Sequence, residues 1–578
     1  MSLIEALSGF LIHNWHFVAV FLAYALIIVL LDRRGTLSKY NITVYYFLFI
    51  PVLMIRTQRG QKLLDRLAVH KRFWRLFANI GLPAMLIGMV VMFLLLLFID
   101  YTMIQSFQTQ TVPHPGKYNE PRNIFLIPGI NEYIPLWWGI IALVVTLVVH
   151  EFSHAILCKV EGIKVKSMGL LVAFFPIGGF AEPDEEQLLG KIEEPGKETQ
   201  EQKEPKKLAT RSERVRVLTS GVMANFVTAL IAFILFFSFL GSISPVGEVM
   251  VTGVVPGSPA ELAGVKPNMI LTGINDKQIN NGNDFLSYAQ GLEPGTNITL
   301  HLIDRKVRKS VSLVTKVGNQ TSFGVRIFSV IPASPAEAAG LKPDMILIRL
   351  DNTEITGLED FVDFMNSTKP GQKIDVHVRS NSSLNASTVV FSNIELAKHP
   401  HDSEIKKGFM GVTYSSEGGA VSHSIGIGIG QFQAKGFLGM MQSIPSLLTG
   451  VTGWILLFSL PIYGFAGEGF PGFSGLIINF YEPVGMAAGL GDGMFWILNA
   501  LLWIGWMNFY VGLFNCLPAL PLDGGHVFRD VVAASLSRFF GNGEKIERIS
   551  NAIAVFLAIM ILVSFLLVIF GPYAAHGF

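Results

Sequence analysis

Long apolar runs separated by polar stretches dominate this chain. A bilayer span needs about 20 consecutive, mostly apolar residues, and five stretches reach or approach that length. A sixth is richer in Trp and Gly but still mainly apolar. The pattern therefore predicts a polytopic α-helical membrane protein with about six transmembrane helices. The predicted helices are Phe10–Leu31, Phe77–Ile99, Pro135–Cys158, Val215–Leu240, Phe495–Phe514 and Ala552–Phe570.

The distribution of basic residues orients these helices. Ten Lys or Arg residues fall between Arg33 and Arg75, whereas the loop at 101–134 holds only two. Because cytosolic loops are enriched in Lys and Arg, the first loop is expected to be cytosolic and the second external. Alternation then directs the helix ending at Cys158 toward the cytosol. It places the polar insertion after Leu240 on the external side.

One apolar stretch does not fit this alternation. Leu447–Phe465 contains Pro461 and several glycines. A full extra span here would put the two halves of the candidate site, described below, on opposite sides of the membrane. The stretch is therefore expected to re-enter the membrane, to lie at its interface, or to form one arm of a hairpin with Phe473–Tyr481.

The polar insertion contains a repeat. Val254–Leu271 recurs 76 positions later as Val330–Leu347, and such agreement at one offset indicates a duplicated domain. Each copy predicts a strand, a short helix opened by Ser-Pro and closed by Gly, and a second strand. Over about Gly247–Leu396 the insertion resembles the small α+β PDZ domains of bacterial and archaeal proteases. That resemblance implies binding of extended peptides or C-termini at a sheet edge, with Phe323–Val325 and Phe409–Val412 as candidate carboxylate-binding loops. An ordinary strand start is an equally good interpretation of the second loop.

Composition and charge support a membrane protein. Hydrophobic residues make up 51% of the chain and charged residues 15%, against roughly 25% charged in soluble proteins. The formal net charge of +1 argues against a nucleic-acid partner. Cys158 and Cys516 both lie in apolar runs, so no disulfide framework is expected. The first apolar run lacks a basic region before it, which favours a retained anchor over a cleaved signal peptide.

Candidate chemistry begins at the motif His150-Glu151-Phe152-Ser153-His154, near the inner end of an apolar helix. Positions i and i+4 share one helix face, so both imidazoles can bind one Zn²⁺ while Glu151 lies beside them as a general base. Ionisable side chains in a membrane span are costly unless they serve a site. Cys158, one turn further on, could also reach a metal, but Cys is common as a small residue in apolar helices.

A second motif can complete the metal site. The stretch Asn515-Cys-Leu-Pro-Ala-Leu-Pro-Leu-Asp523-Gly-Gly ends a transmembrane helix with two prolines, a carboxylate and paired glycines. Catalytic zinc usually takes three protein ligands, and Asp523 can be the third. A broken helix is tolerated in lipid only where it is buried or lines a cavity, so the prolines suit an internal site. His526 is more typical of a cytosolic-rim residue than of a ligand.

Together these motifs resemble those of the site-2 protease family of intramembrane zinc metalloproteases. Gly221-Val-Met-Ala-Asn225 matches the Gly-x-x-x-Asn helix of that family, although Asn225 could instead bridge helices. The resemblance implies a Zn²⁺ cofactor. It also implies zinc ligation by His150, His154 and Asp523, catalysis by Glu151, and substrate or oxyanion positioning by Asn515.

The implied activity is endoproteolysis of transmembrane segments in regulated intramembrane proteolysis, by zinc-activated water with Glu151 as general base. Val165–Phe180, directly after the zinc helix, resembles the family's membrane β-hairpin, whose edge would pair with unwound substrate. A simple apolar loop is the alternative. A transporter and a catalytically silent scaffold that presents the PDZ-like domains are the alternative functions.

The expected protein is a multi-pass cell-membrane enzyme with its site toward the cytosol and its PDZ-like domains outside. Its expected partners are the lipid bilayer, membrane proteins with a transmembrane segment, and peptides or C-termini. The expected domains are an N-terminal helix pair with a cytosolic loop (1–134), the first half of the protease core (135–241), two PDZ-like domains (245–317 and 318–413), a linker with the re-entrant or hairpin segment (414–494), and the second half of the core (495–578).

Overall fold

The chain divides into two compact units in the computed structural model. The membrane unit comprises Met1–Phe239, Trp454–Gly472 and Trp496–Phe578, and the insertion unit comprises Leu240–Gly453 and Phe473–Phe495. The residues that the structure describes are 15–47, 50–57, 61–116, 119–120, 123, 127–173, 176–189, 207–254, 258–293, 295–305, 309–317, 325–327, 329–331, 334–342, 345–355, 358–379, 388–398, 407–413, 420–422, 425–463, 470–541 and 543–577.

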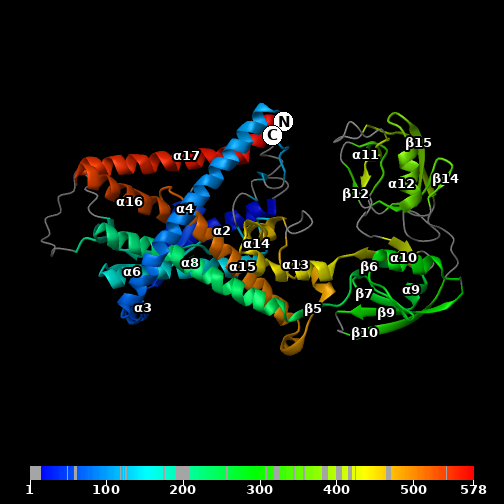
Figure 1. Cartoon of the computed structure of the whole chain (residues 1–578), viewed down its shortest axis with the longest axis horizontal. Coiled ribbons are helices and arrows are strands. Elements are labelled where there is room, and N and C mark those ends of the chain that lie inside the picture. Colours follow the sequence, from blue (N-terminus) through cyan, green and yellow to red (C-terminus); the bar gives the residue numbers. More distant parts are fainter. Residues whose placement is uncertain are drawn as a thin grey trace. The chain divides into compact units, whose positions relative to one another are not determined.

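Five helices are long and apolar enough to cross a membrane, and they confirm five of the predicted spans (Figure 1). The first predicted span, Phe10–Leu31, lies partly outside the described residues. Helix α2 (Trp15–Arg33) covers the remainder. The protein is therefore a multi-pass membrane protein. The five helices are α4 (Lys71–Gln108), α6 (Leu136–Glu161), α8 (Arg211–Leu240), α15 (Asp492–Asn515) and α17 (Glu544–His576).

Glycines let the membrane helices approach closely. A Cβ added at Gly505 or Gly512 of α15 would lie 2.7–2.8 Å from the rings of Phe233 and Phe226 on α8. Small residues at such positions allow close helix packing in membranes, where no hydrophobic effect drives helices together. The shorter helices beside them are α3 (Gln61–Ala68), α7 (Glu185–Leu189) and α16 (Asp523–Phe540).

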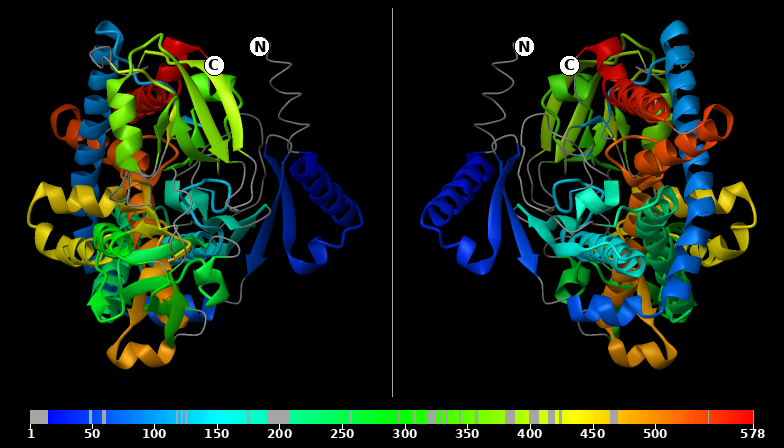
Figure 2. Two further views of the ribbon diagram at one scale, coloured as in Figure 1. Left: turned by 90° about the vertical axis from the view of Figure 1, so that its right-hand side faces the viewer. Right: turned by 90° about the vertical axis from the view of Figure 1, so that its left-hand side faces the viewer.

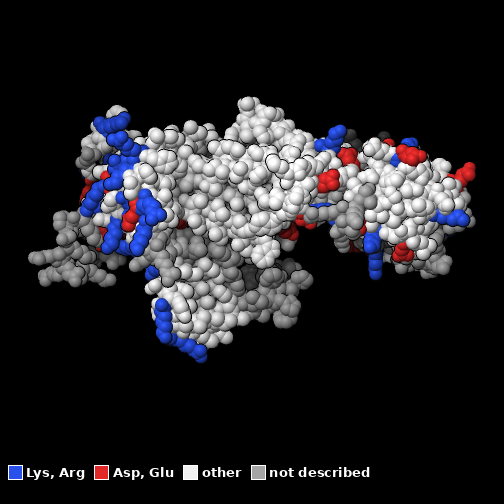
Figure 3. Space-filling view, turned by 90° about the horizontal axis from the view of Figure 1, so that it is seen from below, with Lys and Arg blue, Asp and Glu red and all other residues white. Residues whose placement is uncertain are grey.

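On the face seen in Figure 3, charged residues gather toward one end of the membrane unit, and most of the surface over its helices there is uncharged. Ion pairs join the helix ends there: Arg211 at the start of α8 meets Glu547 near the start of α17 at 2.6 Å, and Lys159 near the end of α6 meets Asp65 of α3 at 2.9 Å. This end carries the basic residues on which the predicted orientation depends.

A four-stranded antiparallel sheet follows the order β1-β2-β3-β4. Its strands are β1 (Ile42–Phe47), β2 (Ile50–Thr57), β3 (Val165–Val172) and β4 (Pro176–Pro183). The β3–β4 pair is the predicted hairpin, and the loop alternative is wrong. The β1–β2 hairpin was not predicted. It pairs with β3 and packs against α2 (Figure 2), where Tyr24 Oη donates to the Pro51 carbonyl at 3.1 Å.

The sheet order leaves β4 at an edge. Strand β2 occupies the other side of β3, and Gly169 permits this close pairing because a Cβ there would collide with the Ile55 carbonyl oxygen. Among the described residues, β4 therefore has one side without a partner strand.

Helix α14 (Val451–Tyr463) occupies most of the ambiguous apolar stretch; residues 464–465 lie outside the described residues. Its 13 residues rise about 20 Å, short of the roughly 30 Å hydrocarbon core, in agreement with a segment that does not span. The Phe458 carbonyl accepts hydrogen bonds from Trp506 Nε1 at 3.0 Å and Tyr510 Oη at 3.1 Å on α15. These bonds hold α14 beside a spanning helix just before Pro461.

The segment named as the other hairpin arm, Phe473–Tyr481, is not a continuous helix, and the hairpin stays a prediction. A 3₁₀ helix (Ile477–Phe480) leads there into strand β20 (Tyr481–Pro483), which pairs with β5 (Ile243–Pro245). Helix α13 (Ala434–Leu447) lies in the same insertion unit, where Tyr481 Oη donates to the Ala434 carbonyl at 2.8 Å.

The insertion unit contains two α+β folds with matching elements, here called the first and second repeats. Each begins its short helix with a capping serine, Ser258 or Ser334, followed by Pro. The first repeat contains β6 (Val249–Val254), α9 (Pro259–Leu262), β7 (Ile270–Ile274), β8 (Lys277–Gln278), α10 (Gly282–Gln290), β9 (Asn297–Asp304) and β10 (Lys309–Lys316). The second contains β11 (Val325–Arg326), β12 (Ser329–Val330), α11 (Pro335–Ala338), β13 (Ile346–Leu350), β14 (Thr353–Glu354), α12 (Leu358–Ser367), β15 (Lys373–Arg379) and β16 (Thr388–Glu395).

The strands that close the two repeats come later in the chain. Strand β17 (Val412–Thr413) pairs with β12, and β19 (Ile427–Gln431) pairs with β6. Strand β18 (Ala420–Ser422) pairs with the other side of β19. The sheet of the first repeat thus extends beyond the expected boundary at residue 317. Residues 323 and 324 of one candidate carboxylate-binding loop lie outside the described residues.

Candidate metal centre

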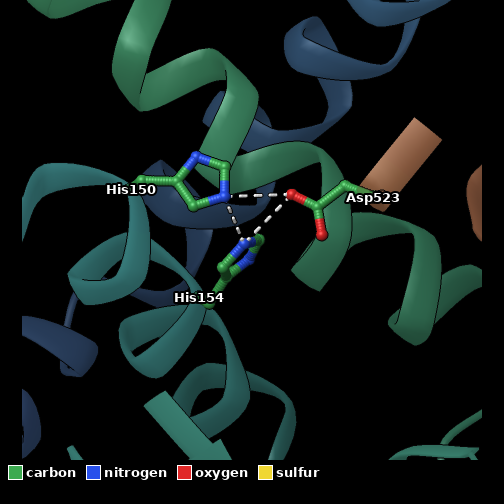
Figure 4. A group of neighbouring side chains, drawn as sticks. All are labelled: His150, His154 and Asp523. Atoms are coloured by element: carbon green, nitrogen blue, oxygen red, sulfur yellow. Dashed lines mark hydrogen bonds and ion pairs between the residues drawn. The ribbon is translucent and has the colours of Figure 1, made fainter. Parts of the chain in front are cut away.

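Three side chains from two distant segments meet at one point (Figure 4). His150 and His154 lie one turn apart on α6, and Asp523 begins α16. The two Nε2 atoms are 3.1 Å apart, and Asp523 Oδ2 lies 3.1 Å from that of His150 and 3.2 Å from that of His154. Zn–N and Zn–O bonds of about 2.0–2.1 Å at tetrahedral angles would separate ligand atoms by about 3.3 Å. The triangle therefore has the size that zinc requires.

The other ring nitrogen of each histidine has its own partner. His154 Nδ1 donates to the Val217 carbonyl of α8 at 2.8 Å, which leaves Nε2 as the lone-pair nitrogen. His150 Nδ1 lies 3.1 Å from the amide of buried Asn225, also on α8. With the amide turned so that Oδ1 accepts from Nδ1–H, this otherwise unpartnered oxygen is also satisfied. Such outer partners fix the tautomer of metal-binding histidines.

In the resulting centre, three hydrogen-bond acceptor atoms face one another. Both Nε2 atoms and the carboxylate oxygen present lone pairs, and Asp523 Oδ2 is buried without a hydrogen-bond donor. Three such atoms about 3 Å apart repel unless a cation lies between them. The donor set of two imidazoles and one carboxylate suits catalytic zinc.

Gly221 makes room for the two histidines. A Cβ on this residue would lie 2.5 Å from His154 Nε2 and 2.8 Å from His150 Cε1. Gly221 and Asn225 are four residues apart on α8 and thus face the same site. The Gly-x-x-x-Asn motif therefore supplies space and a hydrogen bond to the histidines, and Asn225 does more than bridge helices.

Glu151 is directed to the sheet rather than to the triangle. Its Oε2 accepts a hydrogen bond from the Ala181 backbone N–H of β4 at 2.8 Å. This bond holds the carboxylate beside the ligands and places it at the unpaired side of β4. Because the Ala181 N–H bonds to Glu151, it belongs to the side of β4 that has no partner strand among the residues described.

The loop before Asp523 depends on its two glycines. An added Cβ at Gly524 or Gly525 would lie 2.5 Å from the carbonyl oxygen of Leu517 or the carbonyl carbon of Ala519. The chain from α15 therefore folds tightly over the first turn of α16, with a cis peptide bond at Leu520–Pro521. This turn carries Asp523 to the histidines.

Other predicted residues lie apart from the triangle. Asn515 Nδ2 donates to the Val511 carbonyl of its own helix at 3.0 Å, so its positioning role stays a prediction. Cys158 is buried in an apolar cluster and is not part of the ligand group. His526 is half-buried and also outside that group; burial and the neighbouring Arg529 lower its pKa.

Sequence patterns did not indicate the ion pairs that fix the zinc helix. The buried Glu161, at the end of α6, accepts from Arg75 of α4 at 2.8 Å and from Arg216 of α8 at 2.7 Å. Arg214 of α8 donates to Asp530 of α16 at 2.9 Å. Four helices are thereby joined around the site. Single charges near helix ends gave no signal for this pairing.

The family model described as Peptidase family M50 matches residues 138–561, a range that includes all three ligands of the triangle. The chain belongs to peptidase family M50. It is thus a membrane protein of the site-2 protease type.

Individual relatives are distant. The chain is 28% identical over 257 residues to an uncharacterized protein of Methanocaldococcus jannaschii, covering 44% of this chain and 60% of that protein. It is 23% identical over 432 residues to the Regulator of sigma E protease of Haemophilus influenzae, covering 67% and 88%. A 158-residue match at 27% identity to the periplasmic pH-dependent serine endoprotease DegQ of Escherichia coli covers 23% of this chain and 34% of DegQ. The chain thus spans less than two thirds of two of these relatives.

Proposed function

We propose that the protein is an intramembrane zinc metalloendopeptidase that cleaves transmembrane segments of membrane proteins during regulated intramembrane proteolysis. The observation that carries this proposal is the triangle of His150, His154 and Asp523 with Glu151 beside it. Family membership supports proteolysis, and the similarity to the Regulator of sigma E protease supports a role in regulation. A transporter would not need this combination of ligands and general base.

Each residue has a defined task in this proposal. His150, His154 and Asp523 would hold Zn²⁺, which when bound acidifies water and polarises a carbonyl. Glu151 accepts a proton from water and returns it to the departing amine. The hydrogen bond from the Ala181 N–H holds the Glu151 carboxylate in its orientation until then. Asn515 would leave its bond to Val511 and donate to the substrate backbone or to the developing oxyanion.

We infer that the substrate binds as a strand along β4. A helical substrate hides its carbonyls, whereas an extended segment exposes them and can add to a sheet edge. The β1–β2 hairpin occupies the other side of β3, so within the described part of the chain the edge of β4 beside Glu151 is the one without a partner strand. A substrate strand there would run past the carboxylate that activates water.

The orientation of the enzyme completes the proposal. The basic residues at the starts of α4 and α8 favour a cytosolic site and an external insertion unit. The repeats would then act outside the membrane as PDZ-like domains that select substrates by ectodomain size or by a new C-terminus. The matches to periplasmic endoproteases agree with that location.

Comparison of Glu151→Gln with the wild type tests this function. General bases contribute about 10²–10⁴-fold to rate, so the purified variant should keep one zinc per chain and lose cleavage of a transmembrane substrate by that factor. Membranes of cells with the variant should accumulate single-span fragments. Glu544→Gln, at the start of α17 with its side chain 87% exposed and paired, among the described residues, only within its own helix, is the matched control and should cleave normally. A Glu151→Gln protein that holds zinc and cleaves at the wild-type rate would refute the proposal. Equal levels of single-span fragments in cells with the wild type and with the variant would favour a catalytically silent scaffold.

A further inference from the structure

The two repeats are closed by equivalent loops that come in reverse order along the chain. Ser258 Oγ of the first repeat donates to the Gly426 carbonyl at 3.4 Å, and Ser334 Oγ of the second donates to the Gly411 carbonyl at 3.3 Å. Both glycines have left-handed backbone, with φ of +86° and +84°. A Cβ on either would collide with its serine. The pairs Gly426–β19 and Gly411–β17 therefore correspond.

This correspondence means that the second repeat is inserted into the first. The capping serines follow chain order, 76 residues apart, but the glycine that closes the first repeat comes 15 residues after the one that closes the second. Backbone bonds agree: the N–H of Ala260 donates to Ile425 at 3.0 Å, and that of Ala336 donates to Met410 at 2.9 Å. Equivalent strands can thus be compared edge by edge.

The outer edges of β19 and β17 differ. Strand β18 runs antiparallel along β19, with Ala420, Val421 and Ser422 opposite Ile429, Gly428 and Ile427. Helix α10 contacts both β18 and β19. In the second repeat, β17 pairs only with β12 within the part of the chain that the structure describes. An open strand edge exposes N–H and C=O groups that an extended peptide can pair with.

We propose that residues 420–422 are an internal ligand of the first repeat, bound at the edge of β19 beside α10 where an extended peptide would otherwise add as a strand. The corresponding edge of β17 in the second repeat is left for a peptide from another molecule. The two repeats, alike in sequence, are thereby assigned different tasks. This inference does not depend on the proposed protease activity.

Chain connectivity favours the internal strand over any free peptide. Only four residues, 423–426, separate β18 from β19. Short connections give effective concentrations in the millimolar range. A free peptide with the same intrinsic affinity, present at micromolar concentration, would therefore be excluded by about a thousandfold. Opening the site requires that β18 be prevented from pairing.

Full-length protein in nanodiscs, carrying Ala420→Pro together with Val421→Pro, tests this. Neighbouring N–H groups in a strand point to opposite sides, so two prolines remove one ladder bond whichever side faces β19. The matched control, Ala420→Thr with Val421→Thr, keeps both N–H groups and a strand-forming side chain. The probe is a fluorescein-labelled synthetic peptide with the sequence of residues 416–424, and amide hydrogen exchange locates it.

The double-proline variant should bind the probe saturably, and binding should slow exchange at residues 427–431. Wild type and the threonine control should show slow exchange there without the probe and no further change with it. Exchange at 427–431 that is equally fast in wild type and in the double-proline variant would overturn the proposal. So would probe binding to β19 of the wild type as tight as to the variant.

The two prolines could unfold the first repeat, and faster amide exchange in β7 and β9 would reveal this. In that case a disulfide cross-linking measurement tests the pairing of β18 with β19. Val421→Cys with Gly428→Cys joins directly opposite positions and should form an intrachain disulfide. Val421→Cys with Gln431→Cys is the control, because three residues along a strand add about 10 Å, beyond disulfide reach. Equal cross-linking of both pairs, or of neither, would overturn the proposal.

Discussion

Gly221→Ala should weaken zinc binding although the substitution replaces none of the three zinc ligands. The new Cβ would lie 2.5 Å from His154 Nε2 and 2.8 Å from His150 Cε1, where ordinary contacts begin at 3.4 Å. The rings must therefore move by about 0.9 Å and 0.6 Å, whereas metal sites tolerate deviations of about 0.2 Å. His154 has little freedom to retreat because its Nδ1 is bonded to the Val217 carbonyl at 2.8 Å.

The expected loss is about 10–100-fold in zinc affinity, the range seen when outer-shell partners of metal ligands are removed. It can be measured by competition with a fluorescent chelator on purified protein, together with cleavage of a transmembrane substrate. Gly439→Ala on α13, where an added Cβ meets nothing within 4 Å, is the matched control. Ala favours helix more than Gly does, so lower helix propensity cannot explain a loss. Wild-type zinc affinity in Gly221→Ala would refute the steric reasoning.

Three further predictions concern the surroundings of the triangle. Asn225→Leu should lower zinc affinity by about 10–100-fold in the same chelator competition. Asn225→Asp keeps an acceptor for His150 Nδ1–H and should lower the affinity less. Equal losses in the two variants would contradict the hydrogen-bond role of Asn225. Ala181→Pro removes the N–H that donates to Glu151 and should reduce cleavage at least tenfold with zinc content unchanged. The control Ala181→Thr keeps that N–H and should retain activity. A fully active proline variant would contradict the proposed substrate-binding edge of β4. Glu161→Gln should destabilise the protein by about 1–3 kcal/mol, which is less than the loss of a fully buried ion pair because Arg75 is half exposed. Thermal unfolding in detergent measures this loss. An unchanged unfolding midpoint would count against the pairing.

Hydrophobic run length was sufficient to predict five spanning helices, because a bilayer constrains helices to a nearly fixed length. The triangle was also predictable, since the histidine spacing and the Pro-Leu-Asp-Gly-Gly turn are local patterns. The task of Asn225 was not, because it depends on how α8 crosses α6. Residues 42–57 gave no signal for the β1–β2 hairpin, since a short apolar run in a basic loop does not reveal which strand it will join.

The nested arrangement of the repeats escaped prediction for a similar reason. Similarity between Val254–Leu271 and Val330–Leu347 identified the duplication. The closing strand of the second repeat spans only two residues, Val412–Thr413, and that of the first, Ile427–Gln431, is rich in glycine. Strands of this kind carry too little pattern to show which repeat they complete.

Nesting also reverses the order in which the repeats can mature during synthesis. The first repeat needs β19, and 172 residues separate Val254 from its partner Ile427. At roughly 5–20 residues per second, ribosomes take on the order of 10–30 s to supply that strand. The second repeat, complete at Thr413, can fold while the first still exposes the edge of β6. Of the two repeats, the one that begins first is therefore completed last, by strand β19.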